Sequence, residues 1–284
     1  MCAMISRMIR AVLAISVLVF TGIAVYSQTA VQKIVDAEHA FAARAAVDGN
    51  PVAFLAYMTE DAWAFNPDAV KAKPFWEARK RNDALLSWAP NFADSASDGS
   101  FGYTTGNWEW RAKGKDDQPS AFGDFNTIWV RQTDGSYKWL IDIGVGHDKP
   151  AKYSTDFSTG KPTLKKNIPS PQATMDEFDK LAASKGAGAA YQMFAGEDVR
   201  LFREDKLPFV GRGSAAAAID PATTISFGTI TEHKTSKDLA FIFRRYTMSQ
   251  KGNSVETGNQ LQVWKFAGGS WKIVLDVLKA VPLT

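Results

Sequence analysis

The chain is poor in cysteine. Cys2 is the only cysteine among 284 residues, and it lies before an apolar N-terminal run, where it is not placed for lipid attachment. Loss of that N-terminal segment leaves a mature chain without a disulfide, a thiol nucleophile or a cysteine-bound metal. Disulfide-stapled scaffolds and cysteine-dependent hydrolases are therefore excluded as classes.

Metal and phosphate motifs are lacking as well. The three histidines, His39, His147 and His233, show no metal-ligand spacing, and surface or linker positions explain them. Residues 211–214 (GRGS) lack the lysine and the spacing of a phosphate-binding loop. No Gly-x-Ser-x-Gly elbow is present either. We therefore predict neither a metal nor a cofactor.

The charge gives no sign of a nucleic-acid partner. The formal net charge is +3, with 33 basic and 30 acidic residues, but Arg7 and Arg10 lie in the N-terminal segment, so 31 basic residues remain after its loss. The sequence has no clustered stripe of Lys and Arg of the kind that phosphate backbones require. We predict no binding to nucleic acid.

Residues 1–27 have the composition of a secretory signal peptide. Arg7 and Arg10 precede an uncharged run over residues 11–25, and Val25 and Ser27 suit cleavage near Ser27. The run is shorter than the roughly 20 residues of a membrane-spanning helix, which favours cleavage over a retained membrane anchor. We predict an exported protein, periplasmic or extracellular, with no membrane contact after cleavage.

The rest of the chain contains two copies of one domain. Residues 135–142 (GSYKWLID) reappear as residues 269–276 (GSWKIVLD), with Trp129 and Trp264 a few residues upstream. Residues 49–65 pair without gaps with residues 186–202, and the offset changes only between such matches, as loop insertions produce. We predict domains over residues 31–147 and 175–284, joined by a linker over residues 148–174 that is rich in Pro, Lys, Ser and Thr.

Each copy begins with helices and ends with strands. Apolar periodicity predicts helices over residues 31–48, 51–58 and 74–88 and strands over 62–65, 101–111, 125–132 and 137–145. In the second copy it predicts helices over residues 175–185, 188–194 and 214–219 and strands over 198–202, 239–248, 259–266 and 271–278. This order predicts an α+β fold.

Residues 98–111 (DGSFGYTTGNWEWR) and 123–144 (GDFNTIWVRQTDGSYKWLIDIG) resemble the SnoaL-like branch of the nuclear transport factor 2-like (NTF2-like) superfamily. The similarity spans about residues 31–146 and is weaker in the second copy, where Arg244 is expected at the place of Thr104. It implies two tandem cystatin-like cones, each a curved antiparallel sheet with N-terminal helices over its concave side. The superfamily includes isomerases, dehydratases, epoxide hydrolases and cyclases beside members that only bind or dimerise, so the fold constrains function weakly.

The aspartate that ends the repeated motif is the main site candidate. Activities on this fold depend on a buried acid or base inside the cone, so the resemblance implies Asp142 and Asp276, and a raised pKa would suit proton transfer. The preferred interpretation is nevertheless a structural role, in which each carboxylate bonds a neighbouring strand or a helix end, because the same aspartate is present in both copies. His39, on the helix that caps the cone, is a weaker pocket candidate.

The second copy carries a polar strand face. Gln260, Gln262 and Trp264 share one face of their predicted strand, which suits an open pocket wall better than a dry core. The competing interpretation is that this face meets solvent or the other domain. The equivalent face of the first copy is more apolar. The predicted ligand-binding residues are Trp63, Tyr103, Trp129, Asp142, Gln260, Gln262, Trp264 and Asp276.

Two functions fit these observations. The preferred one is an exported, non-enzymatic protein that binds a small apolar molecule or serves as a scaffold, with its cones docked as an intramolecular pseudo-dimer or as a homodimer. The alternative is a cofactor-independent lyase, isomerase or hydrolase that acts on a small apolar carbonyl compound in the first domain. Asp142 would then be the acid/base, with Tyr103 or Trp129 as the wall. A position of Asp142 on the outer face of the sheet would exclude that alternative.

Overall fold

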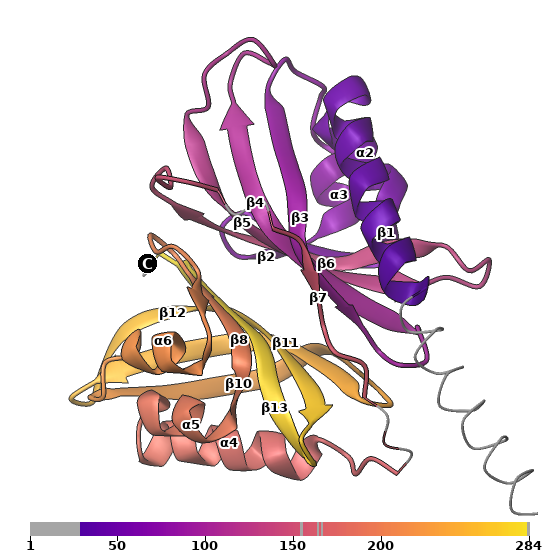
Figure 1. Ribbon diagram of the computed structural model, residues 1–284. Helices are drawn as coiled ribbons and strands as arrows, with labels where there is room; N and C mark the ends of the chain where they lie inside the picture. The colour runs from indigo at the N-terminus through magenta and orange to yellow at the C-terminus, as the bar shows by residue number, and fades with distance from the viewer. Residues whose placement is uncertain (1–28, 154–155, 164, 166, 283–284) are drawn as a thin grey trace, which may run out of the picture.

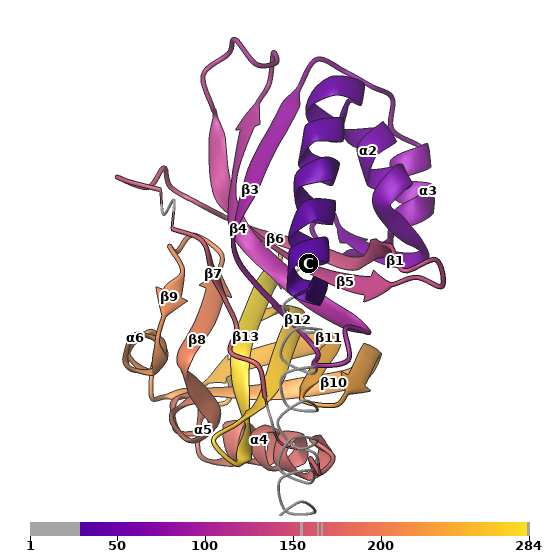
Figure 2. The same cartoon turned by 45° about the vertical axis from the view of Figure 1, so that its right-hand side comes forward.

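The structure is a computed structural model that describes residues 29–153, 156–163, 165 and 167–282. Two units follow one another along the chain, and in each unit helices pack on one face of a curved sheet (Figure 1, Figure 2). The predicted signal peptide, residues 1–27, lies outside the described residues. Within the described part of the chain, no helix is long and apolar enough to cross a membrane.

The first unit combines short helices with a seven-stranded sheet. A helix over residues 29–48 is followed by α2 (Asn50–Tyr57), β1 (Met58–Phe65), β2 (Ala69–Lys71), α3 (Ala72–Glu77), β3 (Leu85–Ser95), β4 (Phe101–Arg111), β5 (Ala121–Arg131), β6 (Tyr137–His147) and β7 (Ser158–Thr159). The strand order is β2-β1-β6-β5-β4-β3-β7. β3 to β6 form an antiparallel meander, whereas β1 runs parallel to β6 and β7 runs parallel to β3.

The second unit repeats this arrangement. Its elements are α4 (Gln172–Ser184), α5 (Ala187–Phe194), β8 (Ala195–Arg203), β9 (Phe209–Val210), α6 (Arg212–Ala217), β10 (Thr223–Ser236), β11 (Leu239–Gln250), β12 (Asn253–Ala267) and β13 (Ser270–Val281). The strand order β10-β11-β12-β13-β8-β9 matches that of the first sheet read from β3 to β2, with β8 parallel to β13, and β7 of the first sheet has no counterpart. The predicted α+β class and tandem arrangement are confirmed, although both sheets are mixed because β1 and β8 join parallel to the last long strand.

Two local features recur at equivalent places in the units. The pairing of β5 with β6 shifts register at Trp129, and the pairing of β12 with β13 shifts at Trp264. Gly49 and Gly186 precede α2 and α5 with φ angles of 89° and 96°, a region that glycine adopts without strain. Trp129 and Trp264 therefore occupy topologically equivalent positions, as the repeat predicts.

Two sequence predictions of local structure are wrong, and the start of α4 lies three residues before its predicted position. The helix predicted over residues 74–88 ends at Glu77, and residues 85–95 form β3, because the alternation of Leu86 and Trp88 has the period of a strand. The segment predicted as a linker contains β7, and α4 begins at Gln172. The predicted counterpart of Thr104 in the second unit, Arg244, is also wrong. Thr104 lies opposite Thr127, whereas Ile242 lies opposite Gln262, which is the counterpart of Thr127.

The register of the second sheet makes Ile242 the counterpart of Thr104, and Arg244 the counterpart of Gly106. Residues 95 and 102 pair across the turn between β3 and β4, whereas residues 235 and 240 pair across the turn between β10 and β11. The second turn is therefore two residues shorter. A shift of two leaves every side chain on its predicted face of the sheet.

The two sheets pack against each other through the faces that carry no helices (Figure 1). The shared apolar cluster includes Ile128 and Ile141 from the first sheet and Leu261 and Leu275 from the second. Across this interface the rings of Phe101 and Phe241 meet edge to face at 5.6 Å. Each sheet thus buries both faces, one under helices and one under the other sheet.

A buried ion cluster lies at the edge of this interface. Lys265 Nζ on β12 is 3.1 Å from the Asp94 carboxylate on β3 and 3.2 Å from the Asp238 carboxylate in the turn after β10. The two turns also exchange hydrogen bonds, because Ser97 N donates to Asp238 and the Ser236 hydroxyl donates to Asp98. The contacts are reciprocal, as expected for two related units docked about a shared axis.

Replacement of the buried lysine should destabilise the protein at the contact between the two units. Lys265→Met leaves the Asp94 and Asp238 carboxylates buried without a cation, so we expect the free energy of unfolding to fall by about 3–5 kcal/mol. Urea unfolding measures this change. Lys180→Met, on the exposed side of α4, is the matched control and should stay within about 0.5 kcal/mol of wild type. Equal effects of the two substitutions would contradict a structural role for the cluster.

Candidate functional site

The first unit encloses a pocket between its helices and its sheet. The pocket has a volume of about 470 Å³, and aromatic side chains form most of its wall: Phe54, Trp76, Trp88, Trp108 and Phe125. Trp76 stacks on Phe54 with the ring centroids 4.0 Å apart, which fixes one side of the wall. A concave, mostly apolar space of this size suits a small organic molecule.

Asp142 is the only acidic residue on the wall of this pocket. It comes from β6, where Gly144 and Gly146 on the same strand face leave the space open. The Thr127 hydroxyl donates a hydrogen bond to its Oδ1 at 2.8 Å, and among the described residues its carboxylate accepts no other. Burial raises the pKa of Asp142 to about 6, against the opposing effect of Thr127. The group can therefore accept or donate a hydrogen bond near neutral pH.

A second carboxylate, Glu38, lies behind the wall with no exposed surface. It comes from the helix over residues 29–48 and accepts hydrogen bonds from Trp88 Nε1 at 2.6 Å, Thr104 Oγ1 at 2.6 Å and Trp129 Nε1 at 3.0 Å. Burial raises the pKa of Glu38 to about 7 despite these donors, and the charge of Asp142 adds to the rise. Glu38 thereby fixes the side chain of Trp88, which forms part of the same pocket wall as Asp142.

Sequence reasoning missed Glu38, although a signal was present. Ile34, Glu38, Phe41 and Ala45 recur at spacings of four, three and four residues, so Glu38 lies on the apolar face of its helix. A charged residue at such a position needs partners, since an unpaired buried charge is costly. His39 was the predicted pocket candidate on this helix. That prediction is wrong, because His39 is exposed on the outer side.

The structure separates the predicted first-unit residues onto two sheet faces. Asp142 and Trp129 lie on the helix side, and Trp129 is fully buried in the core around Phe41. Trp63 and Tyr103 lie on the other face, where the Trp63 ring meets Phe243 at 5.7 Å and Tyr103 belongs to the cluster between the sheets. The prediction that they form the pocket wall is wrong, because alternate strand residues point to opposite faces.

His147 also differs from its predicted surface or linker position. It ends β6 with its side chain buried, and its Nε2 is 3.0 Å from Asp124 Oδ2 while its Nδ1 is 2.7 Å from the Asp148 carbonyl oxygen. Asn107 donates to the other Asp124 oxygen at 2.9 Å. Burial raises the pKa of Asp124 to about 6, opposed by His147. Both ring nitrogens of His147 therefore lie within hydrogen-bond distance of an oxygen atom.

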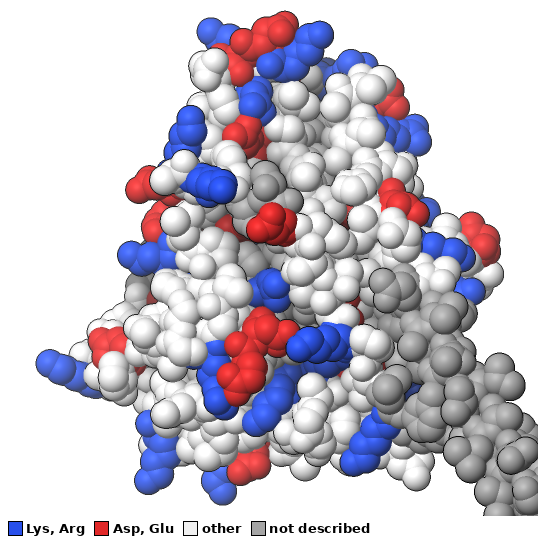
Figure 3. Space-filling model, viewed as in Figure 1, with Lys and Arg blue, Asp and Glu red and all other residues white. Residues whose placement is uncertain are grey.

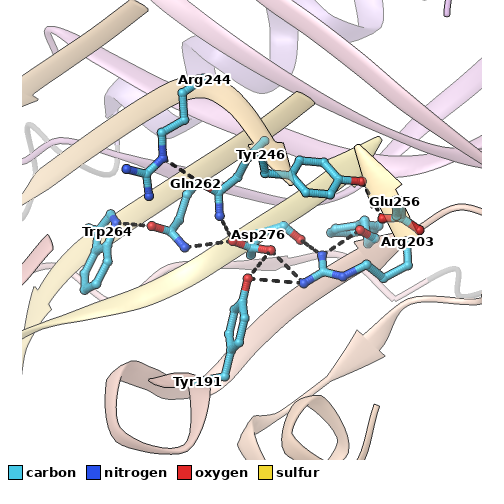
Figure 4. Close-up of polar contacts among 10 residues, drawn as sticks. Tyr191, Arg203, Arg244, Tyr246, Glu256, Gln262, Trp264 and Asp276 are labelled. Carbon is cyan, nitrogen blue, oxygen red and sulfur yellow. Dashed lines mark hydrogen bonds and ion pairs between the residues drawn. The ribbon is translucent and has the colours of Figure 1, made fainter. Parts of the chain in front are cut away.

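The second unit holds a closed polar network where the first has its pocket (Figure 4). Asp276 accepts hydrogen bonds from Tyr191, Gln260 and Gln262, each at 2.8 Å, and pairs with Arg203 at 2.8 Å. Trp264 Nε1 donates to Gln262 at 2.8 Å. Gln260, Gln262, Trp264 and Asp276 have no exposed surface, so the predicted polar pocket wall is a satisfied interior instead. A smaller crevice of about 270 Å³ beside the network is lined by Tyr191 and Arg203 but by none of those four.

Side-chain size at one position accounts for part of the difference between the units, because Gly144 lines the pocket, whereas Gly106 lies against the backbone of Ala89 on β3. Strand register places Arg244 and Leu278 of the second unit where the first has Gly106 and Gly144. The Arg244 guanidinium fills its space and bonds Gln260 at 2.9 Å and Asp179 at 2.7 Å. The pocket is therefore a property of the first unit, and the repeated aspartate has two different surroundings.

No protein-family model and no curated protein matches this sequence. Similar solved structures include an NTF2-like protein of unknown function from Shewanella oneidensis, with 20% identity, coverage of 38% of this chain and 98% of that chain, and a TM-score of 0.32. A protein of unknown function with a cystatin-like fold from Nostoc punctiforme is 12% identical, with coverage of 39% and 88% and a TM-score of 0.33.

An NTF2-like protein with a cystatin-like fold from Novosphingobium aromaticivorans is 18% identical, with coverage of 37% and 77% and a TM-score of 0.31. Each match spans about 40% of this chain, which is the length of one unit. Two of these three neighbours are described as NTF2-like and two as having a cystatin-like fold, in agreement with the sequence resemblance. The likeness concerns the fold alone.

The buried Glu38 should give stability a specific pH dependence. Glu38 holds its proton more tightly in the folded chain, so the stabilisation that it supplies is complete below about 4.5, its ordinary pKa, and is lost as pH rises through about 7. We expect wild type to lose up to about 3 kcal/mol relative to Glu38→Gln across this range. Urea unfolding at several pH values measures the difference. Glu77→Gln, an exposed control, should show none, and a pH-independent difference for Glu38→Gln would contradict the assignment.

Proposed function

We propose that the first unit binds a small, largely apolar molecule that carries a hydrogen-bond donor, and that the second unit is its docked structural partner. The observation that carries this proposal is the aromatic pocket of about 470 Å³ with Asp142 as its only acidic wall residue. Burial of about 200 Å² of apolar ligand surface contributes about 5 kcal/mol before the entropy cost of association.

Asp142 supplies the polar contact in this proposal. Its carboxylate has one protein donor, Thr127, and a desolvated carboxylate is stabilised by a further donor. The other charged residue on the wall is Lys279, whose Nζ is already engaged with the Gly144 carbonyl oxygen at 2.7 Å and with Glu204 at 2.9 Å. A hydroxyl or N–H group on the ligand therefore has Asp142 as its natural acceptor.

The second unit supports the pocket rather than forming a pocket of the same kind. Lys279 and Glu204 both belong to the second unit, and Glu204 also accepts a hydrogen bond from Gly146 N at 2.9 Å. These contacts fix the end of β6, which carries Gly144 and Gly146 into the pocket wall. A filled interior suits a unit whose role is to hold this strand and to cover the apolar face of the first sheet.

A matched pair of probes tests the binding proposal. 2-Naphthol and naphthalene share an apolar body, but only the first carries a hydroxyl donor. Asp142→Asn should weaken 2-naphthol binding about five- to tenfold, the equivalent of one hydrogen bond, and leave naphthalene binding unchanged. Equilibrium dialysis measures both affinities. His39→Ala, exposed on the capping helix, is the control and should change neither. Failure of both probes to bind would contradict the pocket, and equal loss of both would contradict the role of Asp142.

Acid/base catalysis on an apolar carbonyl compound is the second candidate. It is favoured by the position of Asp142 on the pocket side of the sheet and by its pKa of about 6, which suits a group that exchanges protons near neutral pH. In this case Asp142 would remove a proton from the carbon next to the carbonyl group, while the aromatic wall holds the apolar body.

Deuterium exchange distinguishes catalysis from binding alone. With 2-tetralone in D2O, a catalytic Asp142 should speed exchange next to the carbonyl group by about 10²–10⁴-fold over Asp142→Asn. The rate should increase as pH rises through about 6, since the base must be ionised. Proton NMR follows the exchange, and His39→Ala serves as the control. Identical rates for wild type and Asp142→Asn would leave binding as the function of the pocket.

A further inference from the structure

A second space lies between the two units, on the sheet faces that point away from the helices. It has a volume of about 450 Å³ and is lined by Phe92 and Tyr103 of the first unit, by Arg200 and Lys265 of the second, and by Lys161 of the connecting segment. We call it the inter-unit groove. It shares no wall residue with the pocket that holds Asp142, so it is a separate site.

The Tyr103 hydroxyl is the first unusual feature of the groove. Only 1% of the residue is exposed, and its hydroxyl is buried without a hydrogen-bond partner among the described residues. Two residues along the same face of β4, the Thr105 hydroxyl is also buried without a partner there. Buried polar groups are nearly always paired, so such an arrangement indicates an absent partner. Burial raises the pKa of Tyr103 well above its usual range, so the hydroxyl keeps its proton and can donate it.

Arg200 is the second unusual feature. Strand register makes it the counterpart of Trp63, because Trp63 lies beside Ile141 on β6 and Arg200 beside Leu275 on β13. Trp63 fills the interface by packing on Phe243 at 5.7 Å. A cation at the equivalent place is therefore not required for the sheets to pack.

The Arg200 guanidinium keeps most of its donors free. It lies 3.6 Å from the centre of the Phe92 ring, and one N–H group donates to the Asp198 carbonyl oxygen at 3.2 Å. In the described part of the chain no carboxylate forms an ion pair with it. Desolvation lowers the pKa of Arg200, but an arginine stays charged at any physiological pH. A desolvated guanidinium of this kind favours an anionic partner.

The remaining charges of the groove are largely engaged. Lys265 is held by Asp94 and Asp238, Arg212 pairs with Glu197 at 2.6 Å, and Lys272 donates to the Met193 carbonyl oxygen at 2.9 Å. Asp198 and Lys161 are exposed at the rim of the groove and carry opposite charges. Figure 3 shows this mixture of basic and acidic side chains over β8 and α6. Arg200 is thus the half-buried cation of the groove with free donors.

We propose that the inter-unit groove binds a small organic carboxylate. The planar carboxylate accepts two parallel hydrogen bonds from Arg200 and a third from the Tyr103 hydroxyl, while the apolar part of the molecule lies toward Phe92 and Val274. A flat, two-oxygen anion matches the guanidinium fork better than a tetrahedral anion held by a single point charge. Both units contribute to the site, so it exists only when the two sheets are docked.

Titration of the mature protein with benzoate tests this site. We expect saturable binding by isothermal titration calorimetry, with a Kd of about 1 mM or tighter. Arg200→Met, which keeps the stem over Phe92, and Tyr103→Phe should each weaken it about tenfold or more. Lys180→Met, which removes an exposed cation outside the groove, and Asp142→Asn, which alters the other pocket, should leave the affinity unchanged. Thermal unfolding of each variant checks that the fold is retained.

Several results would overturn the proposal. Absence of saturable binding to wild type, or full affinity in both Arg200→Met and Tyr103→Phe, would remove the site. Loss of benzoate binding in Asp142→Asn would place the ligand in the first-unit pocket instead. Sulfate that competes with benzoate at equal affinity would show a general anion site rather than a carboxylate site. If Arg200→Met does not fold, Arg200→Lys keeps the charge but removes the fork, and undiminished affinity in that variant would equally contradict the geometry.

Discussion

Burial of both faces of each sheet is the constraint on which the rest of the structure depends. Helices cover one face and the opposing sheet covers the other, so successive residues of a central strand enter two different cores. On β5, Ile128 belongs to the cluster between the sheets, whereas Trp129 belongs to the cluster under the helices. Polar residues on such strands have no water to face. Each one must find a partner, line a cavity or remain unsatisfied.

These three outcomes account for the polar residues that stand out in the two units. Asp276 is partnered by a tyrosine, two glutamines and an arginine within a closed interior. Asp142 lines a cavity with one hydrogen bond. The Tyr103 hydroxyl is buried in the docked interface without a protein partner among the described residues. The same duplicated unit has therefore produced a filled domain and a hollow one, and the change depends on a few side chains next to the repeated aspartate.

The hollow unit owes part of its space to a glycine on β6. Gly144 lines the pocket, and its counterpart in the second unit is Leu278, so a large buried side chain occupies the equivalent place there. Arg244 brings a charge into the same interior, and Asp179 and the glutamine at position 260 stabilise it there. The network thus pairs the polar groups that fill the interior of the second unit.

The sequence by itself determined the duplication, the α+β class and the equivalence of Trp129 and Trp264, because repeated motifs and local periodicity are properties of neighbouring residues. It also identified the aspartate of the repeat as a position of interest. Only the tertiary structure decided that Asp142 meets an aromatic pocket while Asp276 is enclosed, that Trp63 and Tyr103 face the other sheet, and that Glu38 lies behind Trp88. Those outcomes depend on which face of a strand meets which layer and on side chains far apart in the chain, such as the 50-residue separation of Glu38 and Trp88. A two-residue difference in turn length, such as the one that makes Arg244 the counterpart of Gly106, leaves each side chain on the same face of its strand. It nevertheless gives that side chain different neighbours on the adjacent strand.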